Sequence, residues 1–345
     1  MGINTTQATQ WAIKEQANKT KLTEEDLPKP YQEYRDVFSK EKAKCFPLER
    51  EDDHEINFTL DAPKSFDATT YKMEPKAIEF LRKWQDEELA KGFIHYSKSP
   101  YTCPTFLINK KNGEYRVVQD YKKLNEYTIL DNTGPPLISE LIDRLHGKTL
   151  FTKFDMCMEY NNICIKDGHQ YRAAFTTPLG IFEPMVMNFG LRNAPGTFLR
   201  TMNKAFHQIQ NEHPDELLIY IDNILIATPN DVTHHRTIVR KVLEVMHKES
   251  LFFKVSKCKF KKRTVEYLGL LLNGETIKPD PSKIAGLREW PQTLKTVRKV
   301  RSTLGLLNYH RAFIPGFSHI VRPLTCLLKK DELFLWTPAC TKALD

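Results

Sequence analysis

Two acidic residues stand where strongly apolar stretches of this chain end. Asp222 lies in the stretch LLIYIDNILIA, and Asp155 closes the stretch LFTKFD. A lone carboxylate in such a setting is costly to bury, so it shifts its pKa or binds a cation. Two carboxylates at the ends of adjacent strands can share divalent ions such as Mg²⁺, and two such ions stabilise the reacting oxygens of phosphoryl transfer. The pair therefore predicts an enzyme acting on nucleotides or polynucleotides.

A second interpretation of Asp222 needs no ligand. Asp and Asn are common in tight turns between strands, because both tolerate left-handed backbone and bond their own chain. Under this interpretation the stretch 217–227 is an ordinary β-hairpin. Spacing alone does not decide between the turn and the metal site.

The apolar patterns predict the elements that would position these carboxylates. Helices are expected after Pro75, closed by Gly92, and within 135–147, 193–210 and 234–251. Strands are expected at 103–121 as a hairpin with a basic tip, before Asp155, and at 171–190 with a turn at 178–180. Further hairpins are expected at 217–227 and 264–279, and the chain becomes helical and basic from 280. The pattern predicts an α+β domain followed by a smaller, mostly helical unit.

Composition limits the classes of protein without choosing among them. The 345 residues carry 51 Lys and Arg against 43 acidic residues, a net charge of +8. This charge fits either a solvated basic surface or a polyanionic partner such as nucleic acid. Seven scattered cysteines have no zinc-binding spacing and predict reduced thiols. No apolar run approaches the roughly 18 residues of a membrane span, and the start lacks a signal-peptide pattern, so we expect an intracellular protein, cytoplasmic or nuclear, without membrane contact.

Several segments carry a family resemblance when they are taken in order. They read KGFIHYSKSPYTCP, KKNGEYRVVQDYKKLN, PPLISELIDRLHG, FTKFDMCMEY, AFTTPLGIFEPMVMNFGLRNAPGTF, YIDN, KCKFKKRTVEYLGLLL, REWPQTLKTVRKVRSTLGLLNYHRAFI and PLTCLLKKDELFLW. From about Leu27 onward the chain resembles the reverse transcriptase, an RNA-directed DNA polymerase, of gypsy-type LTR retrotransposons. The hairpin of that family is Tyr-x-Asp-Asp, and YIDN is the variant that stands here.

The resemblance implies a right-hand polymerase fold of fingers, palm and thumb, with an antiparallel palm sheet backed by helices. It divides the chain into a flexible segment 1–27, a segment 28–90 leading into the fingers, fingers and palm at 91–272, and a thumb at 273–345. The last segment also resembles the start of a connection to an RNase H domain, of which the sequence contains none. The expected partners are a primed RNA or DNA template and a dNTP; the sequence predicts no oligomeric state.

The resemblance also assigns catalytic roles. Asp155, the backbone carbonyl of Met156 and Asp222 would hold two Mg²⁺ ions, for which Mn²⁺ can substitute, and Asn223 takes the place of the second hairpin aspartate. Nucleotide binding would fall to Lys110, Lys111, Arg116, Tyr160, Phe189 and Gly190. Among these, Arg116 with Lys110 or Lys111 would contact the triphosphate, and Tyr160 would be the steric gate that excludes ribonucleotides.

Primer and template contacts are implied for the last third of the chain. Tyr267, Leu268 and Gly269 match the hairpin that positions the primer end. Basic residues on the following helical faces would contact the duplex backbone, namely Lys295, Arg298, Lys299 and Arg301. Each of these is an ordinary solvated charge under the alternative interpretation.

Some residues depart from the family pattern around the site. They are Asn223, Glu159, Asn161, Asn162, Lys122 and Asn188. An amide at 223 keeps a ligand oxygen but brings no charge, so activity is expected to be impaired. The alternative is a catalytically decayed or repurposed copy that still binds nucleic acid. A small-molecule nucleotidyltransferase would not explain the primer-positioning and thumb segments.

Overall fold

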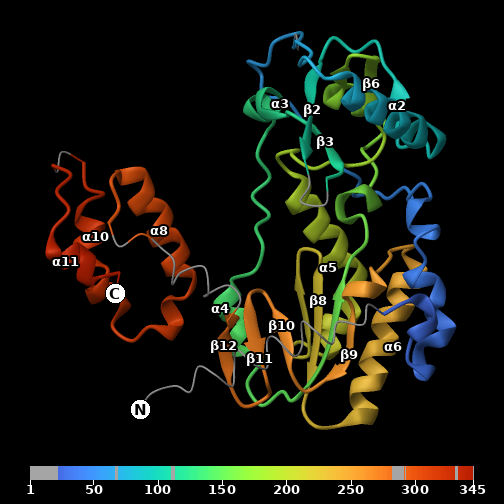
Figure 1. Ribbon diagram of the computed structural model, residues 1–345. Coiled ribbons are helices and arrows are strands. Elements are labelled where there is room, and N and C mark those ends of the chain that lie inside the picture. Colours follow the sequence, from blue (N-terminus) through green and yellow to red (C-terminus); the bar gives the residue numbers. More distant parts are fainter. Residues whose placement is uncertain are drawn as a thin grey trace. The chain divides into compact units, whose positions relative to one another are not determined.

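The computed structural model describes residues 22–66, 69–109, 113–281, 291, 293–330 and 333–344, with the backbone alone at Glu159. Chain contacts divide the protein into a main unit, Lys21–Arg263, and a C-terminal unit that starts at Thr264. Both units combine helices with antiparallel strands (Figure 1).

The carboxylates belong to a four-stranded antiparallel sheet of the main unit, here called the central sheet. Its strands, in spatial order, are β7 (Leu217–Tyr220), β8 (Asn223–Thr228), β4 (Leu150–Asp155) and β9 (Lys259–Lys262). Helices α5 (Ala194–Glu212) and α6 (Val232–Lys248) pack against it, as Figure 1 shows. Strands β4 and β8 are almost wholly buried, which explains their continuous apolar sequence.

A second sheet of the main unit, the outer sheet, holds the basic hairpin. Its strands, in spatial order, are β1 (Ile94–Tyr96), β6 (Gly180–Pro184), β5 (Phe175–Thr177), β2 (Cys103–Asn109) and β3 (Tyr115–Gln119). Only β2 and β5 pair in parallel. Helix α2 (Pro75–Ala90) contacts β1 and β3, and its Trp84 and Leu89 pack on a small core of Ile94, Phe175 and Phe182.

An N-terminal segment runs along the outside of helix α6. It contains the 3₁₀ helices η1 (Glu24–Asp26), η2 (Lys29–Phe38) and η3 (Lys42–Lys44). Tyr31 is buried and stacks on Phe260 with 5.4 Å between ring centroids. Arg50 donates hydrogen bonds to the backbone oxygens of Asn162 at 3.0 Å and Glu249 at 2.7 Å. The segment is therefore part of the main core.

Short helices connect these layers of the main unit. They are α3 (Lys122–Tyr127), α4 (Ile138–Asp143), η4 (Glu159–Asn162), η5 (Gln170–Ala173) and η6 (Val255–Lys257). Of these, η4 is separated from the end of β4 by three residues, so the chain turns soon after Asp155.

The C-terminal unit has its own sheet and core. Strands β10 (Val265–Tyr267), β11 (Leu270–Leu272) and β12 (Ile277–Pro279) form an antiparallel sheet. The helices are α8 (Val297–Tyr309), η7 (Arg311–Phe313), α9 (Phe317–Ile320), α10 (Arg322–Cys326) and α11 (Pro338–Lys342). Leu294, Val300, Leu324, Leu327 and Cys340 form the buried cluster between the helices.

Most expected elements of the main unit are confirmed. The expected helix after Pro75 ends at Ala90, and Gly92 follows in left-handed backbone with φ 74°. The hairpins at 103–121 and 217–227 are present. The single hairpin expected at 264–279 is incomplete, because β12 adds a third strand. Much of the expected helical sequence just after 280 lies outside the described residues.

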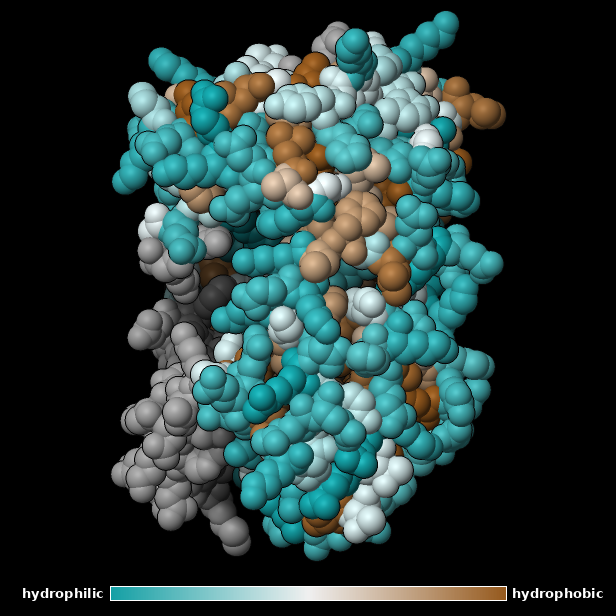
Figure 2. Space-filling model, turned by 90° about the vertical axis from the view of Figure 1, so that its right-hand side faces the viewer, coloured by the Kyte–Doolittle hydropathy of each residue, from teal (hydrophilic) through white to brown (hydrophobic). Residues whose placement is uncertain are grey.

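No helix in the described ranges is both long and apolar enough to span a membrane. The face of the protein in Figure 2 is mainly hydrophilic, and its hydrophobic side chains form separate small groups.

Candidate active site

The register of the central sheet brings Asp155 and Asp222 to the same end. Asp155 on β4 is paired with Asn223 on β8, and the Met156 amide donates a 3.0 Å hydrogen bond to the Asp222 carbonyl. Because Tyr220 pairs with Asn223, Ile221 and Asp222 form a two-residue turn. Ile221 has φ 53°, a strained conformation for a β-branched residue. The neighbouring strands hold this strained turn next to Asp155.

The Asp155 carboxylate is buried and faces a cation. The residue is 7% exposed. Lys257 Nζ lies 2.9 Å from Oδ1 and 3.2 Å from Oδ2, and only the contact with Oδ2 has hydrogen-bond geometry. Among the described residues Oδ1 receives no hydrogen bond. A buried carboxylate whose charge is met by one ammonium can exchange that cation for a divalent ion, which prefers carboxylate oxygens as ligands, so the residues present fit a metal site.

Asn223 contacts the other carboxylate through its amide nitrogen. Nδ2 donates a 2.7 Å hydrogen bond to Asp222 Oδ1. An NH₂ group in this role satisfies the carboxylate but cannot ligate a metal. The hairpin therefore offers one anionic ligand, held by its own neighbour.

The predicted nucleotide-binding residues that are described lie in a continuous series. The Arg116 guanidinium on β3 lies 4.8 Å from the centroid of the Phe189 ring. Phe189 packs edge-on against Tyr160 at 4.7 Å, and Tyr160 against Phe198 of α5 at 5.8 Å. The series links the basic hairpin of the outer sheet to the end of the central sheet. Lys110 and Lys111 lie outside the described residues.

Gly190 completes the same region. It has φ 95°, which favours glycine, and the Asn125 side-chain amide donates a 2.7 Å hydrogen bond to its carbonyl. Phe189, beside it, is 41% exposed, so its ring stands at the surface with Arg116. The structure thus brings together Arg116, Tyr160, Phe189 and Gly190.

The residues that depart from the family pattern bond to their surroundings. Asn161 Nδ2 lies 3.2 Å from Asn188 Oδ1 and 3.3 Å from the Met187 carbonyl. Asn162 Nδ2 donates a 2.7 Å hydrogen bond to the Cys157 carbonyl. Lys122 is exposed and pairs with Asp120 at 3.3 Å. Asn161 and Asn188 therefore bond to each other, and Asn162 bonds separately to the backbone.

Two thiols near Asp155 stay protonated at neutral pH. Burial raises the pKa of Cys258 to about 12 and also raises the pKa of Cys157. Mg²⁺ and Mn²⁺ favour carboxylate and carbonyl oxygens over sulfur, so these neutral thiols are not expected to compete with Asp155 for such an ion.

The primer-positioning residues lie in the C-terminal unit. Leu268 and Gly269 have φ 46° and 68° and form the turn between β10 and β11. The Tyr309 hydroxyl donates to the Leu268 carbonyl, and a side chain at 269 would meet that hydroxyl at 3.3 Å. Tyr267 is buried. The four basic residues are all exposed, with Lys295 before α8 and Arg298, Lys299 and Arg301 on it.

Sequence reasoning missed two residues of the main unit. Lys257 precedes Cys258 in a segment that carried the resemblance, yet nothing local indicated its contact with Asp155, 102 positions away. Arg50 had no motif at all. Both contacts depend on the packing of distant segments.

The chain matches known proteins in sequence and structure. Residues 108–272 match the family described as reverse transcriptase (RNA-dependent DNA polymerase). The Tf2-7 and Tf2-3 transposon polyproteins of Schizosaccharomyces pombe are each 31% identical over 326 residues, covering 94% of this chain. The chain spans 24% of the length of each polyprotein.

Solved structures give the fold. A foamy viral protease–reverse transcriptase in complex with double-stranded DNA covers 99% of this chain and 59% of its own, with TM-score 0.79 and 21% identity. The same kind of enzyme with an RNA/DNA hybrid covers 100% and 45%, with TM-score 0.75 and 20% identity. The expected α+β right-hand polymerase fold is confirmed. Residues 108–272 are a domain of the reverse transcriptase family, a family of nucleotidyltransferases.

Proposed function

We propose that this chain is the RNA-directed DNA polymerase part of a gypsy-type LTR retrotransposon polyprotein. It would extend a primer on an RNA or DNA template with dNTPs. The observation that carries the proposal is the pairing of Asp155 with Asn223, which sets two carboxylates at one end of the central sheet. In this proposal 91–272 serve as fingers and palm and 273–345 as thumb.

Asp155, Asp222 and the carbonyl of Met156 would hold two Mg²⁺ ions, with Mn²⁺ as a substitute. When bound, such ions stabilise charge on the attacking and leaving oxygens of an in-line displacement. The buried setting of Asp155 strengthens its attraction for any cation, because the local dielectric constant is low. Lys257 lies on the same carboxylate, so its ammonium must move or share the site when an ion enters.

The nucleotide would lie along the series from Arg116 to Tyr160. Arg116 has a planar fork that suits triphosphate oxygens, and stacking on Phe189 fixes its position. Tyr160 is held between Phe189 and Phe198, so its ring cannot easily rotate away. A fixed ring beside the sugar would favour deoxyribonucleotides by crowding the 2′-position.

The proposal is tested by primer extension with the purified chain on a primed RNA template. We expect Mg²⁺-dependent incorporation of dNTP that is abolished in Asp155→Asn and in Asp222→Asn. Lys204→Ala serves as control, because Lys204 is an exposed residue paired with Asp52. Equal activity in the wild type and Asp155→Asn would contradict the proposal.

A second candidate function is binding of nucleic acid without catalysis. It is favoured by the Asn223 amide on Asp222 and by the lysine on Asp155, which together leave the carboxylates paired without a metal. This function predicts tight primer–template binding that weakens steeply with salt and is unchanged in Asp155→Ala.

A further inference from the structure

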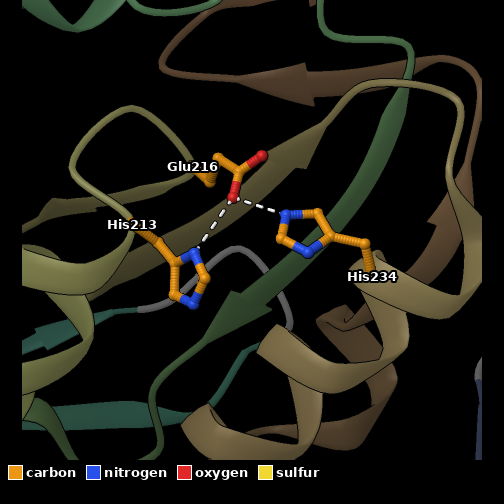
Figure 3. A group of neighbouring side chains, drawn as sticks. All are labelled: His213, Glu216 and His234. Atoms are coloured by element: carbon orange, nitrogen blue, oxygen red, sulfur yellow. Dashed lines mark hydrogen bonds and ion pairs between the residues drawn. The ribbon is translucent and has the colours of Figure 1, made fainter.

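A group of three side chains lies away from the candidate active site. His213 is the residue after helix α5, Glu216 directly precedes β7, and His234 lies in the first turn of α6 (Figure 3). Glu216 Oε2 lies 3.2 Å from His213 Nδ1 and 2.8 Å from His234 Nε2. The three ligand atoms all lie within 4.8 Å of one another.

These separations are close to those around a bound ion. Zinc binds imidazole nitrogen and carboxylate oxygen at about 2.0–2.2 Å with tetrahedral geometry, which sets neighbouring ligand atoms about 3.3–3.5 Å apart. The 3.2 Å contact with His213 is within a few tenths of an ångström of this value, whereas the 2.8 Å contact with His234 would have to lengthen by about half an ångström when an ion enters. Two imidazoles and one carboxylate also form a donor set that zinc uses in proteins with water as fourth ligand.

The neighbouring lysines do not contact Glu216 Oε2, the oxygen that lies beside both histidines. Lys148 Nζ lies 3.6 Å from Glu216 Oε1, the oxygen that does not contact the histidines. Lys241 Nζ lies 3.5 Å from His213 Nε2 and pairs with Glu212, so each lysine is matched by a glutamate. Glu212 Oε2 lies 4.0 Å from His213 Nε2, beyond hydrogen-bond distance, so it adds negative charge beside the imidazole without bonding to it.

The backbone fixes the positions of the three residues. The Glu216 amide donates a 3.1 Å hydrogen bond to the His213 carbonyl, closing a turn that aims both side chains to one side. Asp231 caps α6 and accepts a 3.0 Å hydrogen bond from the His234 amide. Glu216 and His213 are mostly shielded, with side chains 14% and 18% exposed, and His234 is 38% exposed. The group is therefore ordered and open to solvent on one side.

We propose that His213, Glu216 and His234 bind one Zn²⁺ ion, or a divalent transition ion of similar preference. The ion would join the end of α5, the start of β7 and the start of α6. Strand β7 runs from this group to the turn that carries Asp222, so the ion would anchor the far end of the catalytic hairpin strand.

Zinc binding is measured by equilibrium dialysis of the full chain after chelator treatment. Excess Mg²⁺ in the buffer saturates sites made of oxygen ligands alone. We expect one Zn²⁺ per wild-type chain. His234→Gln and Glu216→Gln should each weaken binding by more than about 100-fold, because losing even an outer partner of a metal ligand costs about 10–100-fold.

His247→Gln is the matched control, since His247 is an exposed imidazole paired with one carboxylate, Asp36, at 2.5 Å. It should bind zinc like the wild type. Substitution of Co²⁺ for zinc should give visible bands without the near-ultraviolet thiolate band that a cysteine site would add.

Two results would overturn the proposal. One is a wild-type chain that takes up no zinc. The other is undiminished zinc binding in both His234→Gln and Glu216→Gln. If circular dichroism shows that one variant is unfolded, the other variant and the cobalt spectrum of the wild type still test the proposal.

Discussion

Asn223 is the residue at which the hairpin departs from the Tyr-x-Asp-Asp pattern. Its amide bonds Asp222 at 2.7 Å, so it stabilises the hairpin carboxylate where an aspartate would repel it. Asparagine therefore favours the metal-free state. An aspartate would raise the negative charge of the site and favour the metal-bound state.

Asn223→Asp should lower the stability of the metal-free protein and increase the stabilisation that Mg²⁺ provides. Loss of the hydrogen bond and the added repulsion should lower the free energy of unfolding by about 1–2 kcal/mol in chelator. Mg²⁺ should restore more stability to the variant than to the wild type. Thermal melts with and without Mg²⁺ check this, with Asn211→Asp, at an exposed position of α5, as control. An identical Mg²⁺ response in wild type and Asn223→Asp would count against a metal at this hairpin.

Tyr160 should act through its ring rather than its hydroxyl. Removing the ring in Tyr160→Ala opens the space beside Phe189, so incorporation of rNTP relative to dNTP should rise about tenfold or more. Tyr160→Phe keeps the ring and should leave the ratio unchanged. Steady-state incorporation of each nucleotide measures the ratio. A large rise in Tyr160→Phe would show that packing of the ring is not the cause.

At the scale of elements, apolar periodicity predicted the helices and hairpins that depend on local sequence alone. The helix from Pro75 and the 217–227 hairpin follow from spacing and turn residues alone. The division of 264–279 into three strands was not predicted, because strands of three residues such as Ile277–Pro279 have no periodicity of their own and are set by pairing with β11. Long-range contacts were also inaccessible, since the Arg50 bonds form only after three segments have packed.

The hydrogen bonds of Arg50 should contribute strongly to holding the N-terminal segment on the main core. It bonds carbonyls at residues 162 and 249, and its side chain is 13% exposed. Arg50→Ala leaves these acceptors without a partner, so unfolding free energy should fall by about 2–3 kcal/mol. Urea denaturation measures the change. Lys204→Ala, which removes only an exposed pair, should leave the midpoint unchanged. Equal unfolding midpoints for Arg50→Ala and Lys204→Ala would contradict this stabilising role of Arg50.

For the whole molecule, two buried histidines set the response to acid. His235 bonds the hydroxyls of Thr152 and Thr228, each at 2.8 Å, and His54 bonds Thr197 at 3.0 Å. Burial lowers the pKa of each histidine to about 4, from an ordinary 6.5. The unfolded chain therefore takes up protons at a higher pH than the folded chain does.

Stability should be full above about pH 6.5 and fall as pH decreases toward 4. Each histidine can contribute up to about 3 kcal/mol over this window. Urea denaturation at several pH values measures the slope. His235→Gln should flatten it, whereas His247→Gln, at an exposed position, should not. An unchanged slope in His235→Gln would contradict the assignment.

The C-terminal unit should supply salt-sensitive binding. Each phosphate contact contributes about 0.9 to the slope of log affinity against log salt on a duplex. Alanine at Lys295, Arg298, Lys299 and Arg301 together should therefore weaken primer–template binding and reduce that slope by about two to four. Fluorescence anisotropy across a salt series tests this, with Lys342→Ala as the control from α11. A lower affinity with an unchanged slope would argue against phosphate contacts.

The central claim is that Asp155 and Asp222 form a polymerase site weakened by Asn223. Single-nucleotide incorporation on primed RNA by the wild type, Asn223→Asp and Asp155→Asn tests it most directly. We predict slow incorporation by the wild type, none by Asp155→Asn, and a rise of about 10²–10⁴-fold in Asn223→Asp, equivalent to about 3–5 kcal/mol of transition-state stabilisation. Failure of both the wild type and Asn223→Asp to extend a bound primer would contradict the claim.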